Sequence, residues 1–80
     1  MDWKKGQELL KKYNYDAWIF VDYHGRDHLT KKIVGLSQDF FTSRRWFYIV
    51  FKEREPLKIV SQIESQALEQ LSGETKTYKS

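Results

Sequence analysis

The sequence predicts an α/β domain of the three-layer α/β/α kind, in which a mixed sheet lies between helices. Two continuous apolar runs, 17–22 and 46–51, lack the alternation of apolar and polar residues that a half-exposed strand shows. They therefore indicate strands that are covered on both faces, and helical periodicity elsewhere supplies the covering layers. Eighty residues make one domain at most. We expect a single domain over residues 1–80 with the element order α-β-α-β-β-α-β.

The first third of the chain predicts a helix, a strand and a second helix. Residues 2–13 have apolar side chains at helical spacing and lysines on the other side. Asp2 is suited to cap the start of this helix, and Asn14 is suited to a left-handed stop at its end. The apolar run 17–22 is the first strand. Segment 27–35 follows as the second helix, with an aspartate to cap its start and a glycine to end it.

The remaining elements follow from the same kind of pattern. A strand, a helix and a strand in this order are typical of a crossover, so we expect strands 17–22 and 45–52 to be parallel. A short polar turn then leads to strand 57–60, which predicts an antiparallel hairpin. Ser61 and Glu64 have the spacing of a capping box that opens a third helix. A fourth strand begins at residue 75. It leaves an uncovered edge, so we expect these residues to open a longer polypeptide.

Composition narrows the class of protein. Fourteen basic and eleven acidic residues give a net charge of +3, but the charges are interspersed, which favours a solvated surface over a nucleic-acid stripe. The absence of cysteine excludes disulfides and thiolate metal sites, and it favours a reducing compartment, so we expect a cytoplasmic protein. No segment approaches the roughly 20 apolar residues of a membrane span.

One cluster, residues 22–28, is a candidate metal site. His24 and His28 are four residues apart, which on a helix would place both rings on one face. Gly25 between them favours a turn instead, and a third ligand would have to be Asp22 or Asp27. No nucleophile turn, glycine-rich phosphate loop or paired carboxylate with a raised pKa is recognisable. We therefore expect no metal ion and no catalytic residue in this chain.

Arginines offer two further binding hypotheses. Arg26 could pair with the carboxylate of a peptide through its forked donors, or it could pair with Asp22 or Asp27 on the surface. One hypothesis for the function of the whole chain is a small basic module that binds single-stranded nucleic acid by stacking its bases on Trp46 and Tyr48. In that alternative, Arg44 and Arg45 flank the aromatic residues and take part in the binding. A self-associating structural module is a third possibility.

Several stretches of the chain match a known pattern in the same order. They are Leu9-Leu10, Tyr15-Asp16-Ala17-Trp18-Ile19-Phe20, the segment from His28-Leu29 to Gly35-Leu36, Arg44-Arg45-Trp46-Phe47-Tyr48, Glu55-Pro56-Leu57-Lys58-Ile59-Val60 and Ile63-Glu64. Together they resemble the N-terminal domain of the pita-bread metallopeptidases, the family of creatinase, prolidase and Xaa-Pro aminopeptidase. The resemblance covers residues 7–80, and the arginine-aromatic run with the hairpin behind it is its most specific part.

The resemblance implies a non-catalytic domain that serves oligomerisation and shapes the substrate cleft of a hydrolase. In that family two divalent metal ions (Mn, Co or Zn) lie in a C-terminal domain, where a metal-bound hydroxide attacks the peptide bond. That domain and a second subunit are the expected partners, and nucleic acid and membrane are not. The residues nearest the cleft would be Arg26, Asp27 and His28. This chain departs there from the family's Asn-Ile-Arg-Tyr-like stretch, which weakens the transfer of individual roles.

Overall fold

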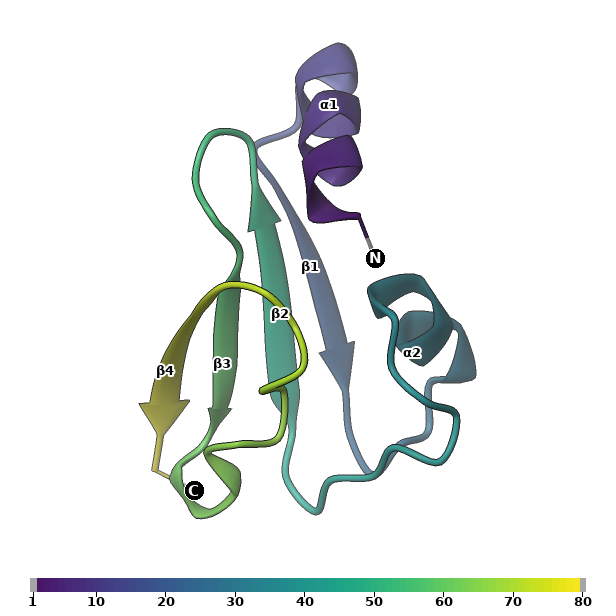
Figure 1. Ribbon diagram of the computed structural model, residues 1–80, viewed down its shortest axis with the longest axis vertical. Helices are drawn as coiled ribbons and strands as arrows, with labels where there is room; N and C mark the ends of the chain where they lie inside the picture. Colours follow the sequence, from purple (N-terminus) through teal and green to yellow (C-terminus); the bar gives the residue numbers. More distant parts are fainter. Residues whose placement is uncertain (1, 80) are drawn as a thin grey trace.

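The computed structural model describes residues 2–79, which form an α/β fold around one mixed sheet (Figure 1). The elements are α1 (Trp3–Tyr13), β1 (Ala17–Asp22), α2 (His28–Val34), β2 (Trp46–Phe51), β3 (Leu57–Ser61), the 3-10 helix η1 (Gln62–Glu64) and β4 (Glu74–Tyr78). The four strands lie in the order β1-β2-β3-β4. The predicted α/β class, mixed sheet and order of elements are confirmed, and the third helix is reduced to a 3-10 turn.

Both α-helices begin and end where their capping residues predict. Asp2 accepts hydrogen bonds from the backbone N–H groups of Lys4 and Lys5, and Asn14 ends α1 with φ of 58°. Asp27 caps α2, and Gly35 ends it with φ of 90°. These caps depend on only a few neighbouring residues, which is why the sequence alone predicted them.

The prediction of parallel strands at the start of the sheet is wrong. β1 and β2 are antiparallel, with Ala17 opposite Phe51 and Asp22 opposite Trp46. A parallel crossover must return the chain to the end of the sheet where β1 began, about 20 Å away for six residues of strand. Helix α2 has seven residues and rises only about 10 Å, so it stays at the end where β1 finishes (Figure 1).

The other two strand pairs make the sheet mixed. β2 and β3 form the predicted antiparallel hairpin, and β3 and β4 are parallel. The crossover 62–73 contains η1 and a series of turns rather than the predicted helix. Lys58 is buried beneath this segment, and its Nζ donates to the carbonyl oxygens of Leu68 (3.3 Å) and Leu71 (2.8 Å). Carbonyls bound by a lysine in this way are satisfied without a regular helix.

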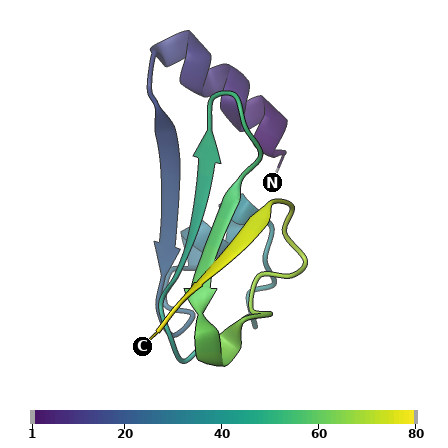
Figure 2. The ribbon, with the colours of Figure 1, turned by 90° about the vertical axis from the view of Figure 1, so that its left-hand side faces the viewer.

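One face of the sheet holds the core. Figure 2 shows α1 and the crossover 62–73 on the same side of the strands, and Val34 of α2 packs in the same cluster. Trp46 and Tyr48 point to this side and are 1% and 2% exposed. The core residues are Leu10, Phe20, Val34, Leu36, Trp46, Tyr48, Val50, Val60 and Leu68.

The opposite face of the sheet is not covered by residues 2–79. Phe47, Ile49 and Phe51 of β2 alternate with the buried residues and are only half-buried. Beside them on β1, Ile19 is 59% exposed and Val21 is 37% exposed. The expectation of a central strand buried on both faces, and of a second helical layer, is therefore wrong for the described part of the chain, since its helical segments all pack on one side.

No helix in residues 2–79 combines the length and the apolar character that a membrane span requires.

Candidate functional site

The turn between β1 and α2, residues 23–27, is held by one buried carboxylate. Asp22 Oδ1 accepts from the backbone N–H of Tyr23 (2.7 Å) and of Asp27 (3.0 Å), so it ties the two ends of the turn together. His24 and Gly25 both adopt left-handed conformations, with φ of 57° and 62°. A Cβ on Gly25 would lie 2.7 Å from the carbonyl oxygen of Phe40, so only glycine fits. The turn is consequently a fixed loop rather than a free one.

His24 is a structural residue of this turn. Its ring stacks on Tyr23, with 3.9 Å between the ring centroids, and lies 5.8 Å from the ring of Phe41. Its Nε2 is 3.1 Å from the carbonyl oxygen of Ser43. Because a carbonyl only accepts, Nε2 carries the proton and donates. This hydrogen bond fixes the turn against the segment that leads into β2.

Two arginines converge on the ring of Tyr23. The Arg26 guanidinium carbon is 5.8 Å from the ring centroid and that of Arg45 is 5.5 Å away. Within residues 2–79 Arg26 forms no ion pair with Asp22 or Asp27, contrary to the surface-pairing interpretation. The sequence predicted Arg26 as a site residue, and it named Arg45 only for the nucleic-acid alternative, so it did not bring Tyr23 and Arg45 together with Arg26. The antiparallel register that places Asp22 opposite Trp46 brings Arg45 beside Tyr23, so correct strand pairing was the signal that could have found them.

Asp27 and His28 have local partners. Thr30 donates its backbone N–H (2.9 Å) and its hydroxyl (2.7 Å) to the Asp27 carboxylate, and these bonds lower the pKa of Asp27. His28 Nδ1 donates to Gln38 Oε1 (2.9 Å), and Gln38 Nε2 donates back to the carbonyl oxygen of His28 (3.3 Å). Of the three predicted cleft residues, Arg26 is therefore the one with a charged group left for a ligand, while the other two fix the start of α2.

The remaining sequence candidates do not assemble into sites. Among the residues that the structure describes, no three His, Cys, Asp or Glu side chains lie where they could hold a metal ion, and His24 and His28 have the separate partners given above. Trp46 and Tyr48 are buried, so the proposed nucleobase platform is wrong. Tyr48 donates its hydroxyl to the carbonyl oxygen of Ser72 (2.8 Å), and burial raises its pKa. The backbone N–H of Arg44 donates to Glu64.

What the site can do chemically follows from its charges. Arg26 and Arg45 present two guanidinium groups around an exposed aromatic ring at the end of β1, and no described acidic side chain forms an ion pair with either. Guanidinium groups in such a position favour a carboxylate or another planar anion.

Comparison with known proteins identifies the fold. No family model and no curated protein matches the chain. Among solved structures, a proline dipeptidase from Streptococcus pneumoniae TIGR4 is similar over 98% of this chain and 55% of its own, with a TM-score of 0.70 and 20% identity. The prolidase from Pyrococcus horikoshii OT3 is similar over 98% of this chain and 20% of its own, with a TM-score of 0.64 and 16% identity.

A third structure links this fold to a named domain. The Creatine_N superfamily domain of a dipeptidase from Streptococcus thermophilus is similar over 96% of this chain and 55% of its own, with a TM-score of 0.60 and 19% identity. The fold expected from the sequence resemblance is thereby confirmed. The chain spans about half the length of the first proline dipeptidase structure that it matches.

Proposed function

We propose that this chain is the front part of the N-terminal domain of an Xaa-Pro aminopeptidase or prolidase-like metallopeptidase, and that it is not itself catalytic. The observation that carries the proposal is the match of nearly the whole chain to the proline dipeptidase structures. The proposal also accounts for the two guanidinium groups that gather at the ring of Tyr23, where they suit the binding of an anion.

In this proposal the turn 23–27 contributes to the wall of a substrate cleft. Arg26 receives the carboxylate of a peptide substrate, and Arg45 adds a second positive charge near the same Tyr23 ring. Asp27 and His28 act as positioning residues, because they fix the start of α2 next to Arg26. Catalysis itself belongs to a C-terminal domain outside these residues, with two divalent metal ions such as Mn, Co or Zn.

The remaining parts of the proposal concern assembly and location. The catalytic domain and a second subunit are the partners that the domain helps to organise, and the cytoplasm is the expected compartment. The described residues do not provide a dinuclear metal site of their own. Any metal ion that the longer protein needs would therefore depend on ligands from elsewhere.

The carboxylate role of Arg26 is tested by an NMR titration of the chain with leucyl-proline and with leucyl-proline amide. We expect the free dipeptide to shift the amide signals of residues 22–28 with a Kd on the order of 100 mM, as suits one solvated ion pair that contributes about 1 kcal/mol. The uncharged amide should cause no comparable shift. Arg26→Gln should abolish the response, whereas Arg54→Gln should leave it unchanged, because Arg54 pairs with Glu74 and lies over the ring of Phe51.

Equal shifts with the acid and its amide, or equal binding by Arg26→Gln, would show that the turn does not recognise a carboxylate.

A further inference from the structure

The strand β1 is an unprotected edge of the sheet. It pairs with β2 on one side only, and no other hydrogen bond within residues 2–79 engages its backbone between Ala17 and Val21. In natural proteins a lysine, a proline, a bulge or a covering element usually prevents an edge strand from pairing with another chain. The run 17–22 contains none of these residues, and Trp18, Ile19 and Val21 are 41%, 59% and 37% exposed. The edge therefore offers alternating free N–H and C=O groups beside apolar side chains.

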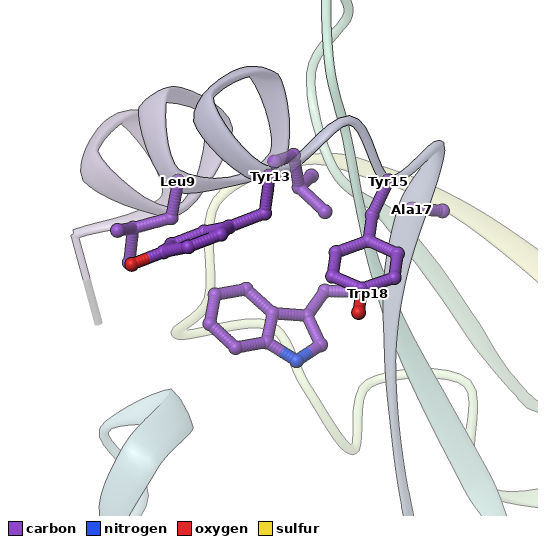
Figure 3. Close-up of a pocket in the computed structure, with 6 residues that line it drawn as sticks. Leu9, Tyr13, Tyr15, Ala17 and Trp18 are labelled. Atoms are coloured by element: carbon purple, nitrogen blue, oxygen red, sulfur yellow. The ribbon is translucent and has the colours of Figure 1, made fainter.

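An apolar groove lies between α1 and the first residues of β1, at the start of this edge. Its volume is about 380 Å³. Figure 3 shows Tyr13 of α1 and Trp18 of β1 facing each other across it, with Tyr15 at its end. The lining residues are Leu9, Leu10, Tyr13, Tyr15, Ala17 and Trp18. Most of these side chains are aromatic or aliphatic and are exposed to solvent, although Leu10 belongs to the core. The groove is thus a pocket for side chains, placed next to a backbone that can accept a strand.

Charge around the groove favours an acidic ligand. The last turn of α1 carries Lys11 and Lys12, and Lys12 Nζ lies 5.4 Å from the ring of Tyr13, at the rim. The acidic residue that precedes the strand, Asp16, forms an ion pair with Lys52 (3.8 Å), so part of its charge is neutralised. A peptide with an acidic residue near this end of β1 is consequently attracted rather than repelled.

We propose that the free edge of β1, with the groove under α1, binds an extended apolar segment of another protein as an added strand. The peptide backbone pairs with β1, alternate side chains enter the groove between Tyr13 and Trp18, and an acidic residue meets Lys12. The partner is not a second β1: antiparallel pairing of two such strands would bring the Lys11 and Lys12 end of one copy toward the Arg26 and Arg45 end of the other, and these like charges repel.

The test uses a fluorescent, capped peptide of about eight residues, two glutamates followed by alternating valine and threonine. The matched control peptide is N-methylated at alternate residues on its pairing edge, which removes its backbone donors but keeps its side chains. We expect the first peptide to bind with a Kd below about 1 mM and to shift the amide signals of Ala17–Asp22, and the N-methylated peptide not to bind. Tyr13→Ala should weaken binding about tenfold.

A matched variant on the open face of the sheet, Ile49→Thr, should bind the peptide as the unmodified chain does, because Ile49 lies on the face away from the groove. Folding of each variant is checked by its amide spectrum. The proposal is overturned by failure of the unmethylated peptide to bind, by equal binding of the N-methylated peptide, or by shifts centred on Phe47, Ile49 and Phe51. A chain that already forms a dimer through β1 in light scattering would also overturn it.

Discussion

The Glu64 carboxylate fixes the segment that leads into β2, although this segment lies about twenty residues earlier in the sequence. Its Oε2 accepts from the backbone N–H (2.9 Å) and the hydroxyl (3.0 Å) of Ser43, and its Oε1 accepts from the backbone N–H of Arg44 (2.9 Å). In Glu64→Gln, one carboxylate oxygen becomes an NH₂ group that faces a donor, so one or two charge-assisted hydrogen bonds are lost. With such bonds each contributing about 1.5–3 kcal/mol before a discount for partial exposure, we expect a loss of about 2 kcal/mol.

The loss should depend on pH. Partial burial raises the pKa of Glu64, but the hydrogen bonds from Ser43 and Arg44 and the charge of Arg44 outweigh it, so the pKa lies below its ordinary value of 4.5. The carboxylate therefore stabilises the fold fully above about pH 4.5, and this contribution disappears as the pH falls through the lowered folded-state pKa. The difference between the unmodified chain and Glu64→Gln should be largest at pH 7 and should shrink toward pH 3.

Urea denaturation followed by tryptophan fluorescence measures both effects. At pH 7 the midpoint should fall by about 2 M if the m-value is about 1 kcal/mol/M, and Tm should fall by about 10 °C. Glu69→Gln is the matched control, since the exposed Glu69 side chain makes no hydrogen bond within residues 2–79. A difference below about 0.5 kcal/mol at pH 7, or one that does not change between pH 7 and pH 3, would refute the role assigned to Glu64.

Three further predictions concern the crossover, the core and the open face. Gly73→Ala should lower the free energy of unfolding by at least about 2 kcal/mol in urea, because Gly73 has φ of 130° and an added Cβ would clash with the Pro56 carbonyl oxygen. Tyr48→Phe should lower it by about 1 kcal/mol, since the bond to Ser72 is lost; an unchanged midpoint would show that water replaces the hydroxyl. The chain should enhance the fluorescence of the dye ANS, and Ile49→Thr should reduce that enhancement because Ile49 is half-exposed on the open face; equal enhancement would place the dye elsewhere.

The elements were predictable where local residues determine them. The run from Trp46 to Phe51 is a strand because aromatic and β-branched residues fill it, and Trp46 and Tyr48 are buried as its pattern predicts. The same run also predicted burial of its other face, and the described residues leave Phe47 and Ile49 half-exposed. Hydrophobic periodicity gives the face on which a side chain lies, but it does not say whether this chain or another covers that face.

Strand direction and the site depended on distances that no short pattern contains. The crossover rule favoured parallel strands, but the short helix α2 and the segment after it stay at the end of the sheet where β1 finishes, so β2 runs antiparallel to β1. Parallel pairing would have placed Arg45 and Tyr23 at opposite ends of the sheet, whereas they are neighbours in the structure. Arg26 was placed correctly in the turn from the sequence, whereas the Tyr23 ring that both arginines approach was not foreseen.

Glu64 shows how tertiary contacts override a local motif. With Ser61 it has the spacing of a capping box, and Ser61 does accept a hydrogen bond from the N–H of Ile63 (3.2 Å). The carboxylate itself turns to Ser43 and Arg44, which offer three donors instead of one. The helix that the motif predicted is accordingly replaced by the 3-10 turn η1.

The central claim, that these residues support a peptidase without catalysing hydrolysis, is tested most directly by incubating the purified chain with leucyl-proline and Mn²⁺ and measuring released proline. The account predicts no release above the rate in buffer with Mn²⁺ alone, at a dipeptide concentration that shifts the amide signals of residues 22–28 before Mn²⁺ is added. Manganese-dependent release that disappears with a chelator would contradict it.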